Sequence, residues 1–413
     1  MIRLSLSGDK IRDKEAIQLP LSKSVANRIL ILQYLYKGKV QTEFDSTCDD
    51  VEVMRESLES KSRIKNIGHA GTAMRFLTAF FSIKESSEVI LEGSERMHQR
   101  PIKLLVSALN SLGADVTYLK NIGYPPLLVK GKKITKEFIE IEGHISSQYI
   151  SALILIAPFL ENGLKIGVKG KLVSRSYIEL TLALLRAMSV YVEVKEEPLS
   201  FKIHPLLSNK LKVLNQEGDW SAASYYYSII ALSPIGSKLR LCLKGAKHSC
   251  QGDRAIVDIM EKAFGVNTEL DNNSLTLIKT ANSKEKFEYN FTNCPDIAQT
   301  IMVCAAASGI DFVFDGIETL SIKETNRIEA MQNELAKFNV SLKRKKKSGY
   351  CLSGSFQTSN TVIETYNDHR MAMSFAPLGI LGPISIEDEG VVSKSYPNFW
   401  DDMATIGLIS NLI

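Results

Sequence analysis

The stretch LNSLGADVTYL, residues 109–119, joins the end of an amphipathic helix pattern to an alternating strand pattern through Gly113. Glycine tolerates the left-handed conformation that ends many helices, and asparagine does so more often than most other residues. The same shape recurs three times, in LRAMSVYVEVK (185–195), MEKAFGVNTEL (260–270) and LAKFNVSLKRK (335–345). The pivot residues are Gly113, Ser189, Gly265 and Asn339, at steps of 76, 76 and 74 residues. The chain therefore contains an internal repeat of about 75 residues.

A second set of recurring positions marks predicted helix starts. They lie at Ser22 to Ser24, Thr72, Ser147, Ser221, Asp296 and Asp368, and the last five are separated by 75, 74, 75 and 72 residues. A period of this length is too long for a solenoid repeat and fits a unit of two helices with three or four strands. Six such units predict two domains of three units each.

Helix starts carry free N–H groups and a partial positive charge. If the units of a domain are related by rotation, their helix starts converge, and two domains would face one another across a cleft lined by six of them. Taken singly, each Ser, Thr, Asp or Asn there is better explained as a cap. Basic residues accompany these starts, which favours a site for phosphates and carboxylates: Lys23, Arg28, Arg75, Arg100, Arg327, Arg370 and Lys394.

The sequence NDHRMAM, residues 367–373, gives the clearest indication of an anion site, because it places Arg370 at the positive end of a predicted buried helix. Asn367 and Asp368 are natural caps, but an arginine there is unfavourable unless an anion lies beside it. We therefore expect a substrate anion to complete the environment of Arg370.

Composition limits the classes of function. The chain has 413 residues, 45% hydrophobic and 23% charged, and a net charge of only +4, which argues against a nucleic-acid or membrane partner. The N-terminus lacks a signal-peptide core, and the longest apolar run, residues 149–160, is too short to span a bilayer. The six cysteines show no zinc-ligand spacing and are expected to be reduced thiols of a cytoplasmic protein. The basic run 343–347 lacks interleaved aromatic residues and is expected to be a solvated hairpin.

Eight motifs, in order along the chain, carry a resemblance to one family: SKSVANR, AGTAMR, RMHQRPI, SSQY, PDIAQT, KETNR, NDHRMAM and KSYP. Together they resemble the 3-phosphoshikimate 1-carboxyvinyltransferase (5-enolpyruvylshikimate-3-phosphate synthase) family. The resemblance implies an α/β fold, a two-lobed inside-out α/β barrel with six βαβαββ repeats, three per lobe. It places the first lobe at residues 21–216 and the second at 1–20 and 217–413, with the active site in the cleft between them.

The resemblance also implies the reaction. The enolpyruvyl group of phosphoenolpyruvate moves to the 5-hydroxyl of shikimate 3-phosphate, through a tetrahedral intermediate, and phosphate is released, a step of the shikimate pathway to aromatic amino acids. This chemistry requires a general acid at the methylene carbon and a base at the hydroxyl. No cofactor or metal is implied, the partners are the two small substrates, and the family implies a monomer and a target of glyphosate.

Site residues follow from the matching motif positions. The implied catalytic residues are Asp296 as proton acceptor and Glu324 with Lys23 at the enolpyruvyl carbon and leaving phosphate. The implied shikimate 3-phosphate contacts are Lys23, Ser24, Arg28, Ser146, Ser147, Gln148, Ser174, Tyr177, Asp296 and Lys323. The implied phosphoenolpyruvate contacts are Lys23, Gly71, Arg100, Gln148, Arg327, Arg370 and Lys394. Without a Cβ, Gly71 would let the anion approach the helix backbone closely.

Charge arithmetic supports this assignment. The two substrates together bring roughly −5 to −6, since each phosphate carries about −1.5 to −2 and each substrate adds one carboxylate. Six cations of the set, Lys23, Arg28, Arg100, Arg327, Arg370 and Lys394, nearly match that charge.

Two departures flank the Gly71 turn: His69 stands where the family has Asn, and Phe76 where Pro is common. Two alternatives stay open. The sister enzyme that uses UDP-N-acetylglucosamine carries a cysteine where this chain has Glu95. A non-catalytic anion-binding relative is the other alternative, and the presence of Asp296, Glu324 and Lys23 weighs against it.

Overall fold

The computed structural model describes residues 1–8, 10–13, 15–42, 48–144, 146–345, 349–358 and 360–412. The backbone divides into two compact units. The middle unit is Lys23–Gln216, and the terminal unit combines Met1–Ser22 with Glu217–Ile413. Part of the basic run 343–347, residues 346 and 347, lies outside the described residues.

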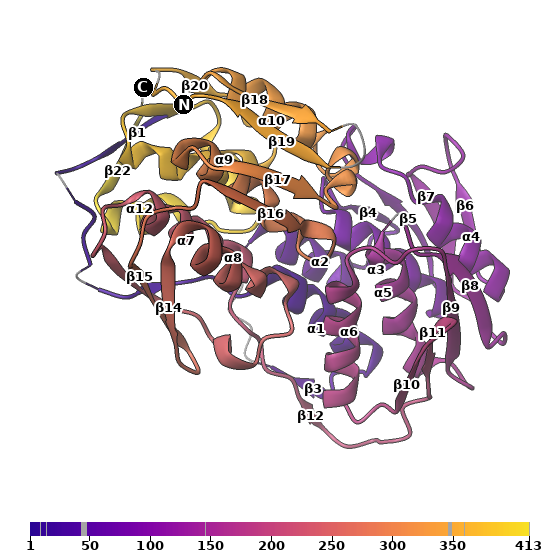
Figure 1. Ribbon diagram of the computed structural model, residues 1–413. Coiled ribbons are helices and arrows are strands. Elements are labelled where there is room, and N and C mark those ends of the chain that lie inside the picture. Colours follow the sequence, from indigo (N-terminus) through magenta and orange to yellow (C-terminus); the bar gives the residue numbers. More distant parts are fainter. Residues whose placement is uncertain are drawn as a thin grey trace. The chain divides into compact units, whose positions relative to one another are not determined.

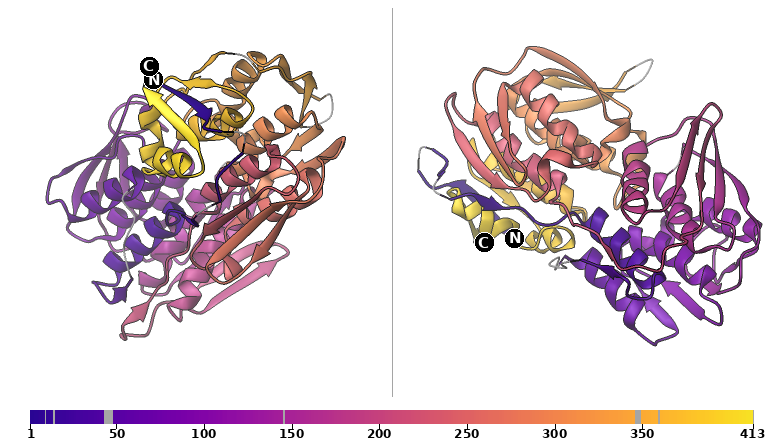
Figure 2. Two further views of the ribbon diagram at one scale, coloured as in Figure 1. Left: turned by 90° about the vertical axis from the view of Figure 1, so that its left-hand side faces the viewer. Right: turned by 90° about the horizontal axis from the view of Figure 1, so that it is seen from below.

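The terminal unit contains three mixed four-stranded sheets, ordered β14-β15-β13-β2, β16-β17-β19-β18 and β20-β21-β1-β22. Each has one parallel pair, β2 with β13, β16 with β17 and β20 with β21, and its other pairs are antiparallel. The strands are β1 (Ile2–Leu6), β2 (Ile17–Gln18), β13 (Lys238–Cys242), β14 (Val266–Leu270), β15 (Ser274–Lys279), β16 (Lys286–Asn290), β17 (Asp311–Asp315), β18 (Val340–Arg344), β19 (Tyr350–Gly354), β20 (Val362–Ile363), β21 (Ile384–Ile386) and β22 (Leu408–Leu412). Strand β1 pairs with β22, so the two ends of the chain lie side by side (Figure 2).

The middle unit has two mixed four-stranded sheets, ordered β4-β5-β7-β6 and β10-β11-β9-β8. In place of a third four-stranded sheet, the described residues form only the parallel pair β3 and β12. The strands are β3 (Val40–Gln41), β4 (Ile64–Asn66), β5 (Glu88–Glu92), β6 (Asp115–Tyr118), β7 (Leu127–Lys130), β8 (Phe138–Glu142), β9 (Leu164–Lys169), β10 (Val192–Glu196), β11 (Leu199–Ile203) and β12 (Lys212–Val213).

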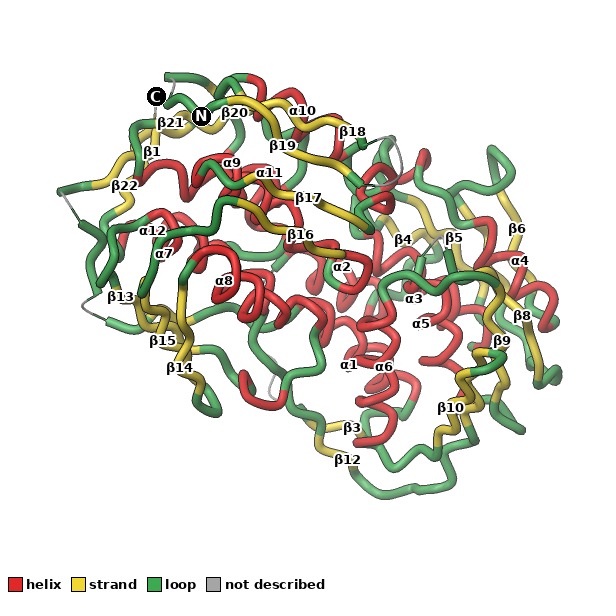
Figure 3. The backbone as a smooth tube through the Cα atoms, in the orientation of Figure 1, coloured by secondary structure: helices red, strands yellow, loops and turns green. Residues whose placement is uncertain are grey.

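The six expected helix starts are confirmed, and each begins a buried helix. These helices are α1 (Lys23–Leu35), α3 (Gly71–Ile83) and α5 (Ser147–Ile156) in the middle unit, and α7 (Trp220–Leu232), α9 (Ala298–Ser308) and α11 (His369–Phe375) in the terminal unit (Figure 1; α11 is labelled in Figure 3). They are apolar around most of their circumference, which is the pattern of a helix enclosed by protein on all sides. In each unit they contact one another.

The second helix of each repeat is more amphipathic: α2 (Asp49–Glu59), α4 (Lys103–Leu112), α6 (Arg175–Ala187), α8 (Ile256–Phe264), α10 (Arg327–Ala336) and α12 (Phe399–Thr405). In the terminal unit the strands lie around the helices α7 and α9 (Figure 3). Helices inside and sheets outside confirm the expected α/β fold class. The sheets remain separate within the described residues and do not close into one barrel.

The pivot residues confirm the repeat. Gly113, Ser189, Gly265 and Asn339 have φ of 109°, 65°, 64° and 61°, the left-handed region, and β6, β10, β14 and β18 follow them. The structure adds a fifth pivot that the sequence comparison missed, Gly407 with φ of 92°, between α12 and β22. Gly407 lies 68 residues after Asn339. This spacing is shorter than the other steps, so the repeat did not reveal Gly407 in the sequence.

Membrane insertion was not expected. Across the described ranges, none of the helices is long and apolar enough to cross a membrane.

Candidate active-site residues

In the terminal unit, hydroxyl side chains of the three buried helices are linked by hydrogen bonds. Ser224, Thr300 and Ser374 lie on α7, α9 and α11, and their hydroxyl groups form a chain with distances of 3.3 Å and 3.3 Å. These residues are 76 and 74 positions apart, so the repeat places equivalent positions together. The helix starts also meet within this unit, because Arg370 at the start of α11 donates to Ser221 Oγ at the start of α7 at 3.2 Å and to the carbonyl of Asp296, just before α9, at 3.0 Å.

Arg327 is the centre of a charged cluster in the terminal unit. Its side chain is 1% exposed, and it binds Asp368 through two N–H groups, with Nε–Oδ2 at 2.7 Å and Nη2–Oδ1 at 3.1 Å. The same guanidinium lies 3.0 Å from Glu324 and 3.4 Å from Asp296. Arginine can serve three carboxylates because its planar fork presents five donors.

Arg370 lies at the first turn of α11, as the sequence indicated. Asp368 caps this helix by accepting a hydrogen bond from the backbone N–H of Arg370 at 3.0 Å. The Arg370 guanidinium donates to the backbone carbonyl of Asp296 at 3.0 Å and lies 3.3 Å from its carboxylate. From the sequence we expected a substrate anion beside Arg370. The structure shows that the carboxylate of Asp296 also lies beside this guanidinium and supplies negative charge to it.

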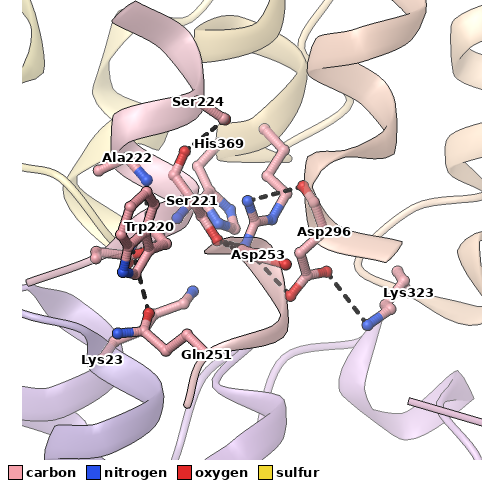
Figure 4. Close-up of polar contacts among 12 residues, drawn as sticks. Lys23, Trp220, Ser221, Ala222, Ser224, Gln251, Asp253, Asp296, Lys323 and His369 are labelled. Carbon is pink, nitrogen blue, oxygen red and sulfur yellow. Dashed lines mark hydrogen bonds and ion pairs between the residues drawn. The ribbon is translucent and has the colours of Figure 1, made fainter. Parts of the chain in front are cut away.

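Two lysines complete this cluster. Lys323 Nζ is 3.4 Å from Asp296 Oδ1, a contact drawn in Figure 4. Lys394 Nζ is 3.4 Å from Glu324 Oε1 and its side chain is 3% exposed. Asp296 and Glu324 therefore each bind Arg327 and at least one other cation. This arrangement keeps two half-buried carboxylates, which would otherwise repel one another, in one group.

In the middle unit, Arg28 is the most unusual charged residue. It is 2% exposed, and its hydrogen-bond acceptors in the described part of the chain are uncharged. These acceptors are Thr181 Oγ1 at 2.7 Å, the Ser24 carbonyl at 2.7 Å, the Tyr177 carbonyl at 3.2 Å and Ser151 Oγ at 3.4 Å. Burial lowers the pKa of Arg28 to about 10, so it stays charged at neutral pH. A buried cation without a carboxylate favours binding of an anion.

Phe76, a departure from the family pattern, contacts this arginine. The Arg28 Cζ atom lies 5.2 Å from the centre of the Phe76 ring. The ring face attracts the guanidinium, which partly offsets the cost of burying its charge.

Gly71 and Arg100 lie against one another. A Cβ atom on Gly71 would be 2.5 Å from Arg100 Nη1 and 2.8 Å from its Cζ. The missing side chain therefore makes room for the Arg100 guanidinium, which adds a reason to the one expected from the sequence. Nearby, Gln148 Nε2 donates to Thr72 Oγ1 at 3.3 Å. Arg75, by contrast, donates to the backbone carbonyls of Gly71 and Pro101 at 2.9 Å and 3.3 Å, a structural role.

The other candidates of the middle unit lie at helix starts. Lys23 begins α1 and binds Asp50 of α2 at 2.8 Å. Ser146 caps α5 by accepting from the N–H of Gln148, and Ser147 is the first residue of that helix. Ser174 precedes α6 with φ of 54°. These positions present hydroxyl and amide groups near free backbone N–H groups, which suits phosphate binding.

Sequence reasoning missed three acidic residues of these clusters. Asp50 binds Lys23, Asp368 was taken only as a cap, and Asp253 accepts a hydrogen bond from the Ser221 hydroxyl (Figure 4). The charge arithmetic counted cations alone and so overstated the net positive charge of the site. For Asp253 a signal existed, because it falls in the loop equivalent to those that hold Arg100 and Lys323 in other repeats.

No metal centre is indicated within the ranges that the structure describes. No group of three or more His, Cys, Asp or Glu side chains there could hold a metal ion.

Comparison with known proteins found one matching family model and several relatives of similar length. A family model described as EPSP synthase (3-phosphoshikimate 1-carboxyvinyltransferase) matches residues 15–403. A protein of Bacteroides fragilis named 3-phosphoshikimate 1-carboxyvinyltransferase is 42% identical over 398 residues, covering 95% of each chain. One of Haemophilus influenzae with the same name is 36% identical over 431 residues, covering 95% of this chain and 96% of the other.

The solved structures agree in fold. The EPSP synthase of Acinetobacter baumannii, solved at 2.37 Å, superposes with a TM-score of 0.76 over 99% of both chains at 19% identity.

Proposed function

Because the chain belongs to the EPSP synthase (3-phosphoshikimate 1-carboxyvinyltransferase) family, we propose that it transfers the enolpyruvyl group of phosphoenolpyruvate to the 5-hydroxyl of shikimate 3-phosphate. Inorganic phosphate is the second product. The proposed pathway is that of aromatic amino acid biosynthesis, in which this reaction precedes chorismate.

One observation carries the chemical part of this proposal. Asp296 and Glu324 are both within 3.4 Å of Arg327, and each also lies within 3.4 Å of a lysine. The reaction needs a base at the 5-hydroxyl and an acid at the methylene carbon of the donor. Two carboxylates held in one cationic cluster provide both groups.

Substrate anions would change the balance within this cluster. A phosphate or carboxylate that binds Arg327, Arg370 or Lys394 competes with Asp296 and Glu324 for these cations. Negative charge placed beside the two carboxylates favours their uptake of a proton. In the proposed mechanism Glu324 then protonates the methylene carbon while Asp296 accepts the proton of the hydroxyl. In the elimination step the bond to phosphate breaks, Glu324 takes a proton back from the methyl carbon, and the proton accepted by Asp296 is released with the phosphate.

The middle unit has the chemistry to bind the phosphate of the acceptor. Arg28 is buried with uncharged acceptors, and Ser146, Ser147 and Ser174 lie at helix starts. Lys23 carries the remaining assigned proton role, and its ammonium group forms an ion pair with Asp50 at 2.8 Å.

The proposed lobes are residues 21–216 and residues 1–20 with 217–413. We propose that the enzyme is a monomer in the cytoplasm. All six cysteines are thiols, which suits a reducing compartment.

The deciding experiment measures phosphate release from phosphoenolpyruvate with and without shikimate 3-phosphate. We expect release only with the acceptor present, and loss of at least about a hundredfold in Asp296→Asn, the typical contribution of a general base. Asp311→Asn is the matched control, because Asp311 is an exposed aspartate of the same unit. Release that does not depend on the acceptor, or that survives in Asp296→Asn, would refute the assignment.

UDP-N-acetylglucosamine tests the sister activity. We expect no phosphate release when it replaces shikimate 3-phosphate, since the sister family's cysteine position is occupied by Glu95. Turnover with this acceptor would favour the sister enzyme. No turnover with either acceptor would favour a non-catalytic relative.

A further inference from the structure

A third recurring position lies in the loop between a strand and the amphipathic helix that follows it. Four of these loops contain proposed substrate contacts: Arg100 before α4, Ser174 before α6, Lys323 before α10 and Lys394 before α12. The fifth loop runs from β13 to α8 and contains none. Asp253 lies there, in the short helix η4 (Gly252–Ala255), 79 residues after Ser174 and 70 before Lys323. The repeat therefore places Asp253 where its counterparts contribute to the site.

The contacts of Asp253 connect it to that site within the terminal unit. Asp253 is 6% exposed and accepts a hydrogen bond from the Ser221 hydroxyl at the start of α7 (Figure 4). The Ser221 oxygen in turn lies 3.2 Å from Arg370 Nη2. The same nitrogen of Arg370 lies 3.3 Å from the Asp296 carboxylate.

The direction of these hydrogen bonds follows from the groups themselves. A guanidinium can only donate, so the Ser221 oxygen accepts from Arg370. The single hydroxyl proton of Ser221 is then directed to the Asp253 carboxylate. This polarises the hydroxyl toward Arg370 and fixes its rotation, because a hydroxyl without an acceptor would turn freely.

The charged surroundings of Asp253 come from several elements. Asp219 lies at the start of α7, Cys294 and Asp296 lie at η6 (Pro295–Ile297), and Arg370 belongs to α11. Burial and the charge of Asp296 raise the pKa of Asp253 to about 7, while Arg370 and Ser221 act in the opposite direction. Near neutral pH, this carboxyl group is therefore divided between its two forms.

We propose that Asp253 is a positioning residue of the enolpyruvyl transfer, which holds the Ser221 hydroxyl and through it orients the Arg370 guanidinium toward the anionic donor substrate. The inference rests on the proposed function. Asp253 does not touch the reacting atoms in this scheme; its effect passes through Ser221.

The first test is steady-state kinetics of Asp253→Ala, Ser221→Ala and the double variant at pH 8. We expect each single change to raise the KM for phosphoenolpyruvate roughly fivefold, the size of one lost hydrogen bond, with the KM for shikimate 3-phosphate nearly unchanged. If Asp253 acts through Ser221, the double variant resembles Ser221→Ala alone. Effects that multiply in the double variant would overturn the proposal, as would single variants with the KM of the wild type.

The second test uses Asp253→Asn, which keeps an oxygen acceptor and removes the charge. A charge-assisted hydrogen bond is roughly twice as strong as a neutral one. The ratio of kcat/KM for phosphoenolpyruvate, wild type over variant, should therefore rise as pH increases through about 7, the pKa of Asp253. A ratio that is constant between pH 6 and pH 8, or a lower KM in the variant, would refute the role. This isosteric variant also carries the test if Asp253→Ala does not fold.

A stability control comes from the opposite end of α7. Lys279 Nζ donates to the carbonyls of Ala231 and Phe264 at 2.8 Å and 2.6 Å. Lys279→Met should lower the melting temperature without changing either KM, so destabilisation alone can be separated from loss of positioning. Wild-type enzyme that releases no phosphate with both substrates refutes the proposed function itself, whereas active wild type with unaltered Asp253 variants refutes only this inference.

Discussion

Replacing Arg327 with methionine should strongly destabilise the terminal unit. The change keeps a similar volume and leaves three carboxylates without their shared cation: Asp368 at 0% side-chain exposure, Glu324 at 15% and Asp296 at 16%. Removing one partner of a buried ion pair typically costs about 3–5 kcal/mol, because an uncompensated charge remains buried. For a unit of this size, that corresponds to a fall in Tm of roughly 6–20 °C.

The pH dependence of this loss distinguishes an electrostatic cause from a packing defect. In Arg327→Met the buried carboxylates take up protons more readily in the folded state than in the unfolded one. Stability of the variant then falls as pH rises, so its deficit relative to wild type is larger at pH 8 than at pH 5. Urea unfolding at both pH values, followed by tryptophan fluorescence, measures the deficit.

Two further variants sharpen the test. Arg327→Lys keeps the charge but loses the bidentate contact with Asp368, so we expect an intermediate loss of roughly 1–3 kcal/mol. Arg240→Met is the matched control in the same unit, because Arg240 is 47% exposed and its Nε lies 3.4 Å from Asp13; its loss should stay within about 1 kcal/mol. A deficit below about 1 kcal/mol in Arg327→Met, equal at both pH values, would show that the cluster does not stabilise the fold as argued.

Three other predictions concern the Gly71 contact, the pivot residues and the Asp253 carboxyl group. Gly71→Ala places a Cβ 2.5 Å from Arg100 Nη1, so the KM for phosphoenolpyruvate should rise roughly tenfold in steady-state assays, and an unchanged KM would contradict the displacement of Arg100. Gly113→Ala at φ of 109° should cost about 1–2 kcal/mol in urea unfolding, whereas Asn339→Gly at φ of 61° should be neutral or stabilising; the reverse order would be incompatible with the pivot geometry. Asp253 has a raised pKa of about 7, so its ionisation lowers the stability of the fold as pH rises from about 4 to 7. Asp253→Asn should therefore have a free energy of unfolding up to roughly 2–4 kcal/mol above that of wild type at pH 8, and little above it at pH 4, as measured by calorimetry.

Much of the architecture could be predicted from local patterns. The pivots Gly113, Ser189, Gly265 and Asn339 adopt left-handed conformations. Few residue types tolerate this conformation at low cost, so residue type and spacing reveal the pivots in the sequence. The buried helices were predictable for a related reason, since an apolar run that follows a capping residue is typical of an enclosed helix.

The third sheet of the middle unit was not predictable in the same way. The six-fold periodicity suggested equal units, but only the β3 and β12 pair forms there in the described residues. Strand pairing joins residues 40–41 to residues 212–213, far apart in the chain, and no local pattern encodes such a contact.

The sequence by itself determined the repeat, the helix starts and the cationic residues, because each depends on conformational preference and residue chemistry within a few positions of the chain. Only the tertiary structure decided which charges meet. It paired Lys23 with Asp50, gathered Asp296, Glu324 and Asp368 around Arg327, and left Arg28 among uncharged acceptors. Electrostatic interactions depend on distance and burial in space, and neither quantity is a property of sequence spacing.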